Sequence, residues 1–145
     1  MAIYFYTPVD EYGCFSNFSP HGVALDDRWW RTVEHYFQAQ KFVAPEHQLR
    51  IWKARTPKDA KTLGWSRAVP IRPDWDEAKD EVMYRAVLCK FQTHSAIRET
   101  LLSTGRETLV ENAPRDFYWG CGEDGSGLNR LGEILMRVRD ELQQA

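Results

Sequence analysis

A carboxylate, an amide and an ammonium group follow one another at helical spacing in the segment Thr32–Phe42. Each helical residue advances about 100° around the axis, so Glu34, Gln38 and Lys41 fall on one stripe. A carboxylate among apolar side chains shifts its pKa unless it is paired, and Lys41 is the available partner. Such a pair is a candidate catalytic group, although a structural ion pair or a solvated helix edge would use the same residues. Six apolar residues surround the stripe: Trp30, Val33, Tyr36, Phe37, Ala39 and Phe42.

A second carboxylate, Asp116, also lies among aromatic residues, in the segment RDFYWG. Two carboxylates, a lysine and aromatic rings suit chemistry at a glycosidic carbon, because a carboxylate stabilises the oxocarbenium-like state of bond cleavage. A desolvated lysine amine can instead attack the sugar carbon and form a Schiff base. Aromatic rings can hold a flat base by stacking. The sequence has no G-x-S-x-G motif and no cysteine with an evident histidine partner, which argues against a hydrolase triad.

The segment from Trp119 to Asn129 contains a literal G-x-G-x-x-G. A dinucleotide-binding motif needs an apolar strand before it and a βαβ unit after it, and neither is evident, so we exclude a Rossmann site. A glycine loop that leads into a helix still offers free backbone N–H groups and the positive end of the helix dipole. Ser126 and Asn129 could then bind a phosphate or a ribose. The alternative is a surface loop in which Ser126 only caps the helix.

Local sequence rules predict five or six helices and about two short strands. The strands are expected at Ile3–Pro8 and at residues 107–112. Thr32 is a predicted N-cap, and Pro45 and Pro57 are predicted to begin the next two helices.

Later helices are bounded by similar patterns. Gly64 is predicted to end one helix as its C′ residue, and Ser95 to cap another that ends at Gly105. Two helices carry apolar residues at spacings of three and four: Ala78, Val82, Ala86 and Cys89 in one, and Leu128, Leu131, Leu135, Val138 and Leu142 in the last. These elements predict an α+β fold in which residues 1–145 form a single compact, helix-rich domain.

Composition and charge exclude several classes of function. The net charge of −2 argues against a general electrostatic grip on nucleic acid, although a local basic pocket remains compatible with it. The three cysteines are odd in number and far apart, which predicts reduced, unpaired thiols. The histidines show no metal-ligand spacing, so we expect no metal and no cofactor. No apolar run is long enough for a membrane span and no signal peptide is evident, so a cytoplasmic protein is expected.

Five segments together resemble the NADAR family, also called the YbiA-like family, over nearly the whole chain. These segments are FSNF, TVEHYFQAQKF, AKTLG, LVENAPRDFYWGCG and GLNRLGEILMRVR, in this order. The resemblance implies a YbiA-like fold and an N-glycosidase that acts on ribosylamino-pyrimidine 5′-phosphate intermediates of riboflavin biosynthesis. Two alternatives remain open. One is a hydrolase that removes ADP-ribose from guanine in nucleic acid, and the other is a non-catalytic module that binds ADP-ribose or NAD.

The resemblance also implies catalytic roles for three residues. Glu34 is expected to stabilise or activate groups at the anomeric carbon. Lys41 either pairs with Glu34 or acts as an amine nucleophile. Asp116 is the second polar candidate and is expected to orient water or the ribose.

Four further residues are implied in substrate binding. Trp119 is expected to stack on the base, while Asn17, Gly127 and Asn129 contact the ribose or the phosphate. One position departs from the family pattern, since Trp65 stands where a basic residue usually follows the glycine of AKTLG. Arg67 is the candidate for that charge instead. A small ribosyl-phosphate or ADP-ribosyl substrate is thus the expected partner; nucleic acid enters only as an ADP-ribosylated substrate, and no membrane is expected.

Overall fold

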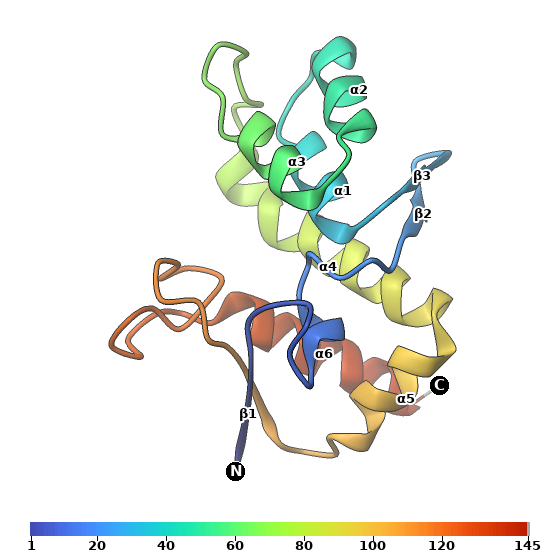
Figure 1. Ribbon diagram of the computed structural model, residues 1–145, viewed down its shortest axis with the longest axis vertical. Coiled ribbons are helices and arrows are strands. Elements are labelled where there is room, and N and C mark those ends of the chain that lie inside the picture. Colours follow the sequence, from blue (N-terminus) through green and yellow to red (C-terminus); the bar gives the residue numbers. More distant parts are fainter. Residues whose placement is uncertain (145) are drawn as a thin grey trace. The chain divides into compact units, whose positions relative to one another are not determined.

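The computed structural model describes residues 1–144, which divide into two compact units. The central unit comprises residues 20–90, and the terminal unit comprises residues 1–19 together with the chain from residue 91 onward. Figure 1 labels the helices and strands along the chain.

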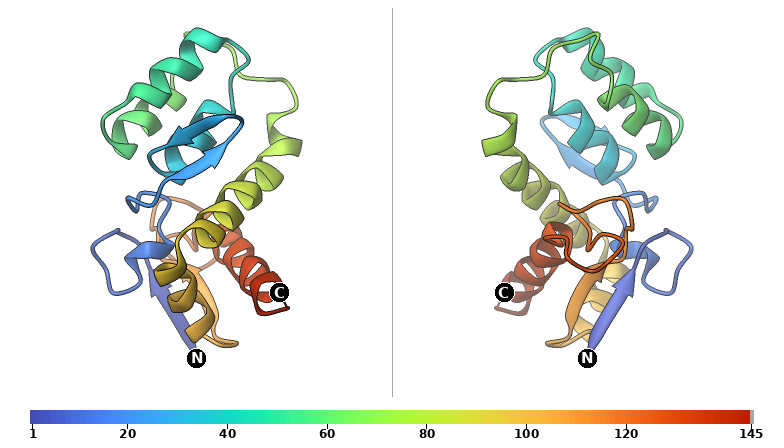
Figure 2. Two further views of the ribbon diagram at one scale, coloured as in Figure 1. Left: turned by 90° about the vertical axis from the view of Figure 1, so that its right-hand side faces the viewer. Right: turned by 90° about the vertical axis from the view of Figure 1, so that its left-hand side faces the viewer.

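The central unit begins with a β-hairpin of β2 (Val23–Leu25) and β3 (Arg28–Trp30), which pair antiparallel. The two residues that join the strands, Asp26 and Asp27, have φ of 54° and 63°. Positive φ at both central positions matches a type I′ turn, whose twist suits a two-residue hairpin. The hairpin lies beside α1 (Val33–Ala39) (Figure 2).

Three short helices pack against one another in the central unit: α1, α2 (Pro45–Lys53) and α3 (Pro57–Gly64). The predicted starts are confirmed. The Thr32 hydroxyl accepts a hydrogen bond from the His35 N–H, and Pro45 and Pro57 occupy the first turns of α2 and α3. Proline is well placed there because a first-turn N–H has no partner within the helix.

Two predictions about helix ends in this unit are wrong. α1 ends at Ala39. The chain then turns at Lys41, and Phe42 forms an isolated β-bridge with Ile71. α3 continues through Gly64 to a cap at Trp65, and Gly64 does not have the positive φ of a C′ glycine. Both boundaries depend on contacts with distant residues.

The longest helix, α4 (Trp75–Thr93), begins in the central unit. Of the predicted narrow seam, Val82 and Ala86 are buried, whereas Ala78 and Cys89 are only half-buried. The buried side chains of α4 are Trp75, Val82, Met83, Tyr84, Ala86, Val87, Lys90 and Phe91, which do not fit one stripe. The helix is therefore enclosed over much of its circumference.

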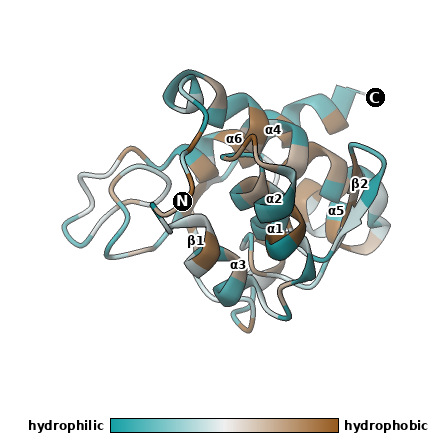
Figure 3. Ribbon diagram, turned by 90° about the horizontal axis from the view of Figure 1, so that it is seen from above, coloured by the Kyte–Doolittle hydropathy of each residue, from teal (hydrophilic) through white to brown (hydrophobic). Residues whose placement is uncertain are grey.

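The terminal unit contains a parallel pair formed by β1 (Ala2–Phe5) and β4 (Thr108–Glu111), which lie side by side in Figure 2. α6 (Arg130–Gln144) packs on β4 and also contacts α5 (Ser95–Ser103). Hydrophobic and hydrophilic residues follow each other along α6 (Figure 3). A short 3₁₀ helix, η1 (Gly13–Phe15), completes the elements described here.

The buried seam of α6 is confirmed at Leu131, Leu135 and Val138. Leu128 is exposed, because it precedes the first turn of the helix. The cap of α5 is His94 rather than the predicted Ser95. Gly105 follows the α5 cap with a φ of 63°, as expected of a glycine that ends a helix.

Six α-helices and four short strands among residues 1–144 confirm the predicted helix-rich α+β class. Both predicted strands are present, although β1 ends at Phe5 rather than Pro8. That residues 1–145 form a single domain stays a prediction.

Candidate active site

The Glu34 side chain is buried in α1, with 6% of its surface exposed, and so is its neighbour Gln38. The Gln38 Nε2 donates a hydrogen bond of 2.7 Å to the Glu34 Oε2, which fixes the orientation of the carboxylate. This i, i+4 contact is the one that helix geometry predicts. The part of the predicted stripe formed by Glu34 and Gln38 therefore exists and is enclosed rather than solvated.

Lys41, the third residue of the predicted stripe, lies beyond the end of α1 and is also buried, with 7% exposed. Its Nζ donates to the Gly64 carbonyl at 3.4 Å, and no ion pair between Lys41 and Glu34 is found among residues 1–144. Burial lowers the pKa of Lys41 to about 8, assisted by Arg67 and opposed by the charge of Glu34. Glu34 thus acts on Lys41 through space.

Gly64 brings α3 close to the polar stripe. A Cβ at this position would overlap the Gln38 side chain, with Oε1 as the nearest atom, so α3 can approach α1 only with glycine here. The Gln38 Oε1 is itself buried without a hydrogen-bond partner in the described chain. With Nε2 committed to Glu34, the amide orientation leaves Oε1 against the Gly64 backbone. Gly64 was predicted only as a helix stop, so its contact with the site was missed.

Two buried histidines support this region. The His35 Nε2 donates to the Ala54 carbonyl, and its Nδ1 accepts from the Thr32 hydroxyl, so the ring is held neutral. Its pKa is lowered mainly by burial. The His47 Nε2 donates to the Leu63 carbonyl at 3.0 Å and thereby ties α2 to the last turn of α3. Both rings act as structural supports in this geometry.

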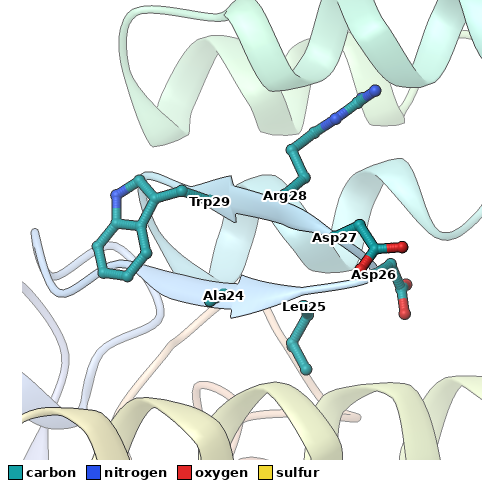
Figure 4. Close-up of a pocket in the computed structure, with 6 residues that line it drawn as sticks. All are labelled: Ala24, Leu25, Asp26, Asp27, Arg28 and Trp29. Carbon is teal, nitrogen blue, oxygen red and sulfur yellow. The ribbon is translucent and has the colours of Figure 1, made fainter.

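The hairpin holds α1 from another side. The Tyr36 hydroxyl donates to Asp26 Oδ2 at 3.0 Å, and burial raises the pKa of Tyr36 to about 12, with the Asp26 hydrogen bond as the next cause. Figure 4 shows the acidic side chains of Asp26 and Asp27 at the tip of the hairpin. A hollow of about 520 Å³ here is lined by residues 24–29 and includes no predicted site residue.

Asp116 lies in the terminal unit and is half-buried. Its Oδ1 accepts hydrogen bonds from the Tyr118 and Trp119 N–H groups, at 3.0 and 2.8 Å. Trp119 is also half-buried, and its carbonyl accepts from the Leu131 N–H at the start of α6. The predicted pair Asp116 and Trp119 is therefore brought together, with one carboxylate oxygen engaged by the backbone.

The glycine loop is tied to its own unit by its polar groups. The Asn129 Oδ1 accepts from the Glu111 N–H, and its Nδ2 donates to the Leu109 carbonyl, both on β4. The Gly127 N–H donates to the Cys121 carbonyl at 2.6 Å, and a Cβ on Gly127 would overlap the backbone at Gly120 and Cys121. These contacts position the loop against β4.

The remaining loop and site predictions have separate outcomes. Ser126 does not cap α6, because its N–H and hydroxyl both donate to Asp124, in a loop that ends before the helix begins at Arg130. Asn17, the last predicted binding residue, is buried beyond η1 in the terminal unit. The structure thus groups Glu34 with Lys41, and separately groups Asp116, Trp119, Gly127 and Asn129; their roles stay predictions.

Residues 1–144 contain no group of three or more His, Cys, Asp and Glu side chains that could hold a metal ion. Cys14, Cys89 and Cys121 form no disulfide bond among residues 1–144. In the same part of the chain, no helix combines the length and apolar character that a bilayer span requires.

The sequence model of the NADAR domain matches residues 4–143. The chain belongs to this family. The family resemblance stated from the sequence motifs is therefore confirmed.

Relatives of the chain agree with this assignment. It is 53% identical to an N-glycosidase of Nostoc punctiforme, with 99% of this chain and 94% of the relative covered. The NMR structure of YbiA from Escherichia coli, a protein named as an N-glycosidase, superposes with a TM-score of 0.91 at 41% identity, covering 99% and 85% of the two chains. The chain also matches a quarter of the maize chloroplastic riboflavin biosynthesis protein PYRR at 44% identity, with 97% of this chain covered. The YbiA-like fold is thus confirmed.

Proposed function

We propose that this chain is an N-glycosidase that hydrolyses the bond between ribose and nitrogen in ribosylamino-pyrimidine 5′-phosphates, intermediates of riboflavin biosynthesis. The names of the relatives support both the bond class and the pathway. The observation that carries the proposal is the buried Glu34 carboxylate, held by Gln38 beside a lysine of lowered pKa. A small ribosyl phosphate as substrate and a cytoplasmic location are part of the proposal.

In the first route, Glu34 stabilises the positive charge that develops on the anomeric carbon. The carbon–nitrogen bond breaks, its electron pair moves to the leaving nitrogen, and that nitrogen takes up a proton from solvent. Water then adds to the anomeric carbon and gives a proton to the Glu34 carboxylate, which returns it to solvent. The products are ribose 5-phosphate and the free pyrimidine amine. The hydrogen bond from Gln38 Nε2 keeps the Glu34 carboxylate in one orientation during these steps.

In the second route, neutral Lys41 attacks the anomeric carbon through Nζ, and the pyrimidine nitrogen leaves with a proton. Ring opening gives a Schiff base, which water hydrolyses to restore the lysine and release ribose 5-phosphate. With a pKa of about 8, about one Lys41 in ten is neutral at pH 7, against about one in three thousand for an ordinary lysine. Burial therefore prepares Lys41 for this route.

Hydrolysis of a ribosylamino-pyrimidine 5′-phosphate by wild type, Glu34→Gln and Lys41→Ala tests the proposal. We expect each variant to lose about a hundredfold or more in kcat, because charge stabilisation and nucleophilic attack each supply several kcal/mol of barrier reduction. Glu46→Gln is the matched control, since Glu46 is exposed in the first turn of α2. A loss below about tenfold in both site variants would contradict direct roles for Glu34 and Lys41.

Two further outcomes separate the alternatives. Borohydride trapping with substrate should give an adduct on Lys41 in the second route, whereas full activity without an adduct supports the first. Tight binding of the substrate by wild type without turnover would contradict the enzyme altogether and identify a binding module.

A further inference from the structure

Several positively charged side chains gather around the buried end of Lys41, all within the central unit. The Arg67 Nη1 donates to the Gly64 carbonyl at 3.3 Å, the same oxygen that accepts from Lys41 Nζ at 3.4 Å. The Lys41 and Lys61 ammonium groups each lie 5.9 Å from the centre of the Trp65 ring. One carbonyl and one indole thus hold three cations together.

The charges around Lys41 are unbalanced. The groups that act on its ammonium are Arg67, Lys61 and Lys79 as cations and Glu34 as the one carboxylate among them. Lys79, on α4, is offset by its own ion pair with Asp76 at 3.4 Å. Lys61 has no ion-pair or hydrogen-bond partner for its ammonium in the described chain. Gathering like charges costs free energy unless a counter-charge joins them.

Three residues of the cluster are accessible to a ligand. Arg67 and Lys61 are exposed, and 64% of the Trp65 side chain is accessible. Arg67 makes its hydrogen bonds within residues 1–144 through Nη1 alone, so Nε and Nη2 remain available as donors. A guanidinium edge presents these two donors in the fork geometry that binds two oxygens of a phosphate.

We propose that Arg67, Lys61 and Trp65 form a phosphate-binding subsite beside the Glu34–Lys41 centre. Arg67 and Lys61 bind the 5′-phosphate of the substrate, and the exposed Trp65 indole packs against the sugar or the base attached to it. This subsite would restrict the enzyme to phosphorylated ribosides. The inference rests on the proposed function for the identity of the substrate, but the binding of a sugar phosphate can be measured without turnover.

The glycine loop was the region predicted to bind phosphate, and its side chains are less suited to that role. The Asn129 amide contacts β4 through both ends, and the Ser126 hydroxyl donates to Asp124. The acidic residues Glu123 and Asp124 also stand within the loop, where they repel an anion. Arg67 and Lys61 instead supply positive charge with unused donors.

The first arm of the test compares kcat/KM for a phosphorylated substrate with that for its dephosphorylated counterpart. We expect Arg67→Glu to reduce this ratio by about tenfold or more and Lys61→Glu by a smaller factor, because charge-assisted hydrogen bonds to phosphate are lost. Any effect of the substitution on Lys41 itself changes kcat/KM for both substrates by the same factor and so drops out of the ratio, because both substrates react at the same centre. Lys58→Glu, on the same helix but not among the groups that act on Lys41, should keep the wild-type ratio. An unchanged ratio in Arg67→Glu overturns the subsite.

The second arm follows the Trp65 indole N–H resonance, assigned through its loss in Trp65→Phe, during titration with ribose 5-phosphate, inorganic phosphate and ribose. Both phosphates should shift the resonance in wild type, about tenfold more weakly in Arg67→Glu, whereas ribose should not. If binding depends on Arg67 but wild type hydrolyses neither substrate, the subsite stands and the proposed function fails. No shift, an equal shift in Arg67→Glu, or an equal effect of ribose overturns the subsite even where hydrolysis proceeds.

Discussion

The α1–α3 region of the central unit and the glycine loop of the terminal unit both carry polar residues among apolar ones, yet they use them differently. In the α1–α3 region, Glu34 is buried, Lys41 has a lowered pKa, and the Gln38 Oε1 has no hydrogen-bond partner in the described chain. In the glycine loop and the segment just before it, the Asn129 and Asp116 side chains accept hydrogen bonds from backbone N–H groups at ordinary distances.

The difference separates two kinds of polar residue. Side chains that satisfy backbone groups stabilise a loop, and their loss should appear first as a loss of stability. Buried groups with shifted pKa values and unused hydrogen-bonding capacity cost stability and are retained where chemistry needs them. We therefore propose that the chemical centre lies in the α1–α3 region and that the Asn129 amide has a positioning role.

The largest effect is expected for Gly64→Ala. The new methyl group would overlap the Gln38 amide and displace the hydrogen bond to Glu34, so kcat should fall by about a hundredfold. Gln38→Ala also loses activity, but in that background Gly64→Ala should add less than in wild type, because the two nearest overlapping atoms, Gln38 Oε1 and Cδ, are gone and only the contact with Cβ remains. Steady-state kinetics of the four proteins measure this coupling. Additive losses would show that Gly64 and Gln38 act independently.

Asn129→Ala should act on stability instead. The substitution leaves the Glu111 N–H and the Leu109 carbonyl without their side-chain partner, which costs about 2 kcal/mol of unfolding free energy. Urea denaturation measures this loss, and kcat/KM well below the midpoint should fall by less than about tenfold. A larger loss of kcat/KM with unchanged stability would instead place Asn129 in direct contact with substrate.

Lys41→Met should have the smallest effect on the unfolding free energy, and it should raise this free energy rather than lower it. Removing a buried ammonium in favour of an apolar chain of similar length should stabilise the protein by about 1 kcal/mol at pH 7. Because the pKa of folded Lys41 is lowered to about 8, the unfolded wild type binds more protons between that pH and about 10.5. The stability of wild type therefore rises relative to that of the variant as pH increases through this window. Thermal melts should show a smaller difference in melting temperature between the two proteins at pH 10 than at pH 7.

Short-range chemistry made part of this architecture predictable. Thr32, Pro45 and Pro57 act within one helical turn of their own position, so sequence alone identified the starts of α1 to α3. The stripe of Glu34 and Gln38 followed from helix periodicity in the same way.

Contacts between distant segments were not predictable in this way. α1 ends early because Phe42 bridges Ile71, and Gly64 matters because Gln38 lies against it. The amide of Asn129 was interpreted as a ligand group, because nothing in the local sequence reveals that its oxygen and its nitrogen both form hydrogen bonds with the β4 backbone. The sequence thus identified the polar residues. Only the tertiary contacts showed which of them hold backbone groups and which lie in the candidate site.

The pH dependence of the single-turnover rate between pH 7 and 10 tests the chemical role of Lys41 most directly. We predict one ionisation near pH 8, the pKa to which burial lowers the Lys41 ammonium. The rate should rise through it if the neutral amine attacks the sugar, and fall if the ammonium supports Glu34. A rate that stays flat from pH 7 to 10 would contradict a chemical role for Lys41.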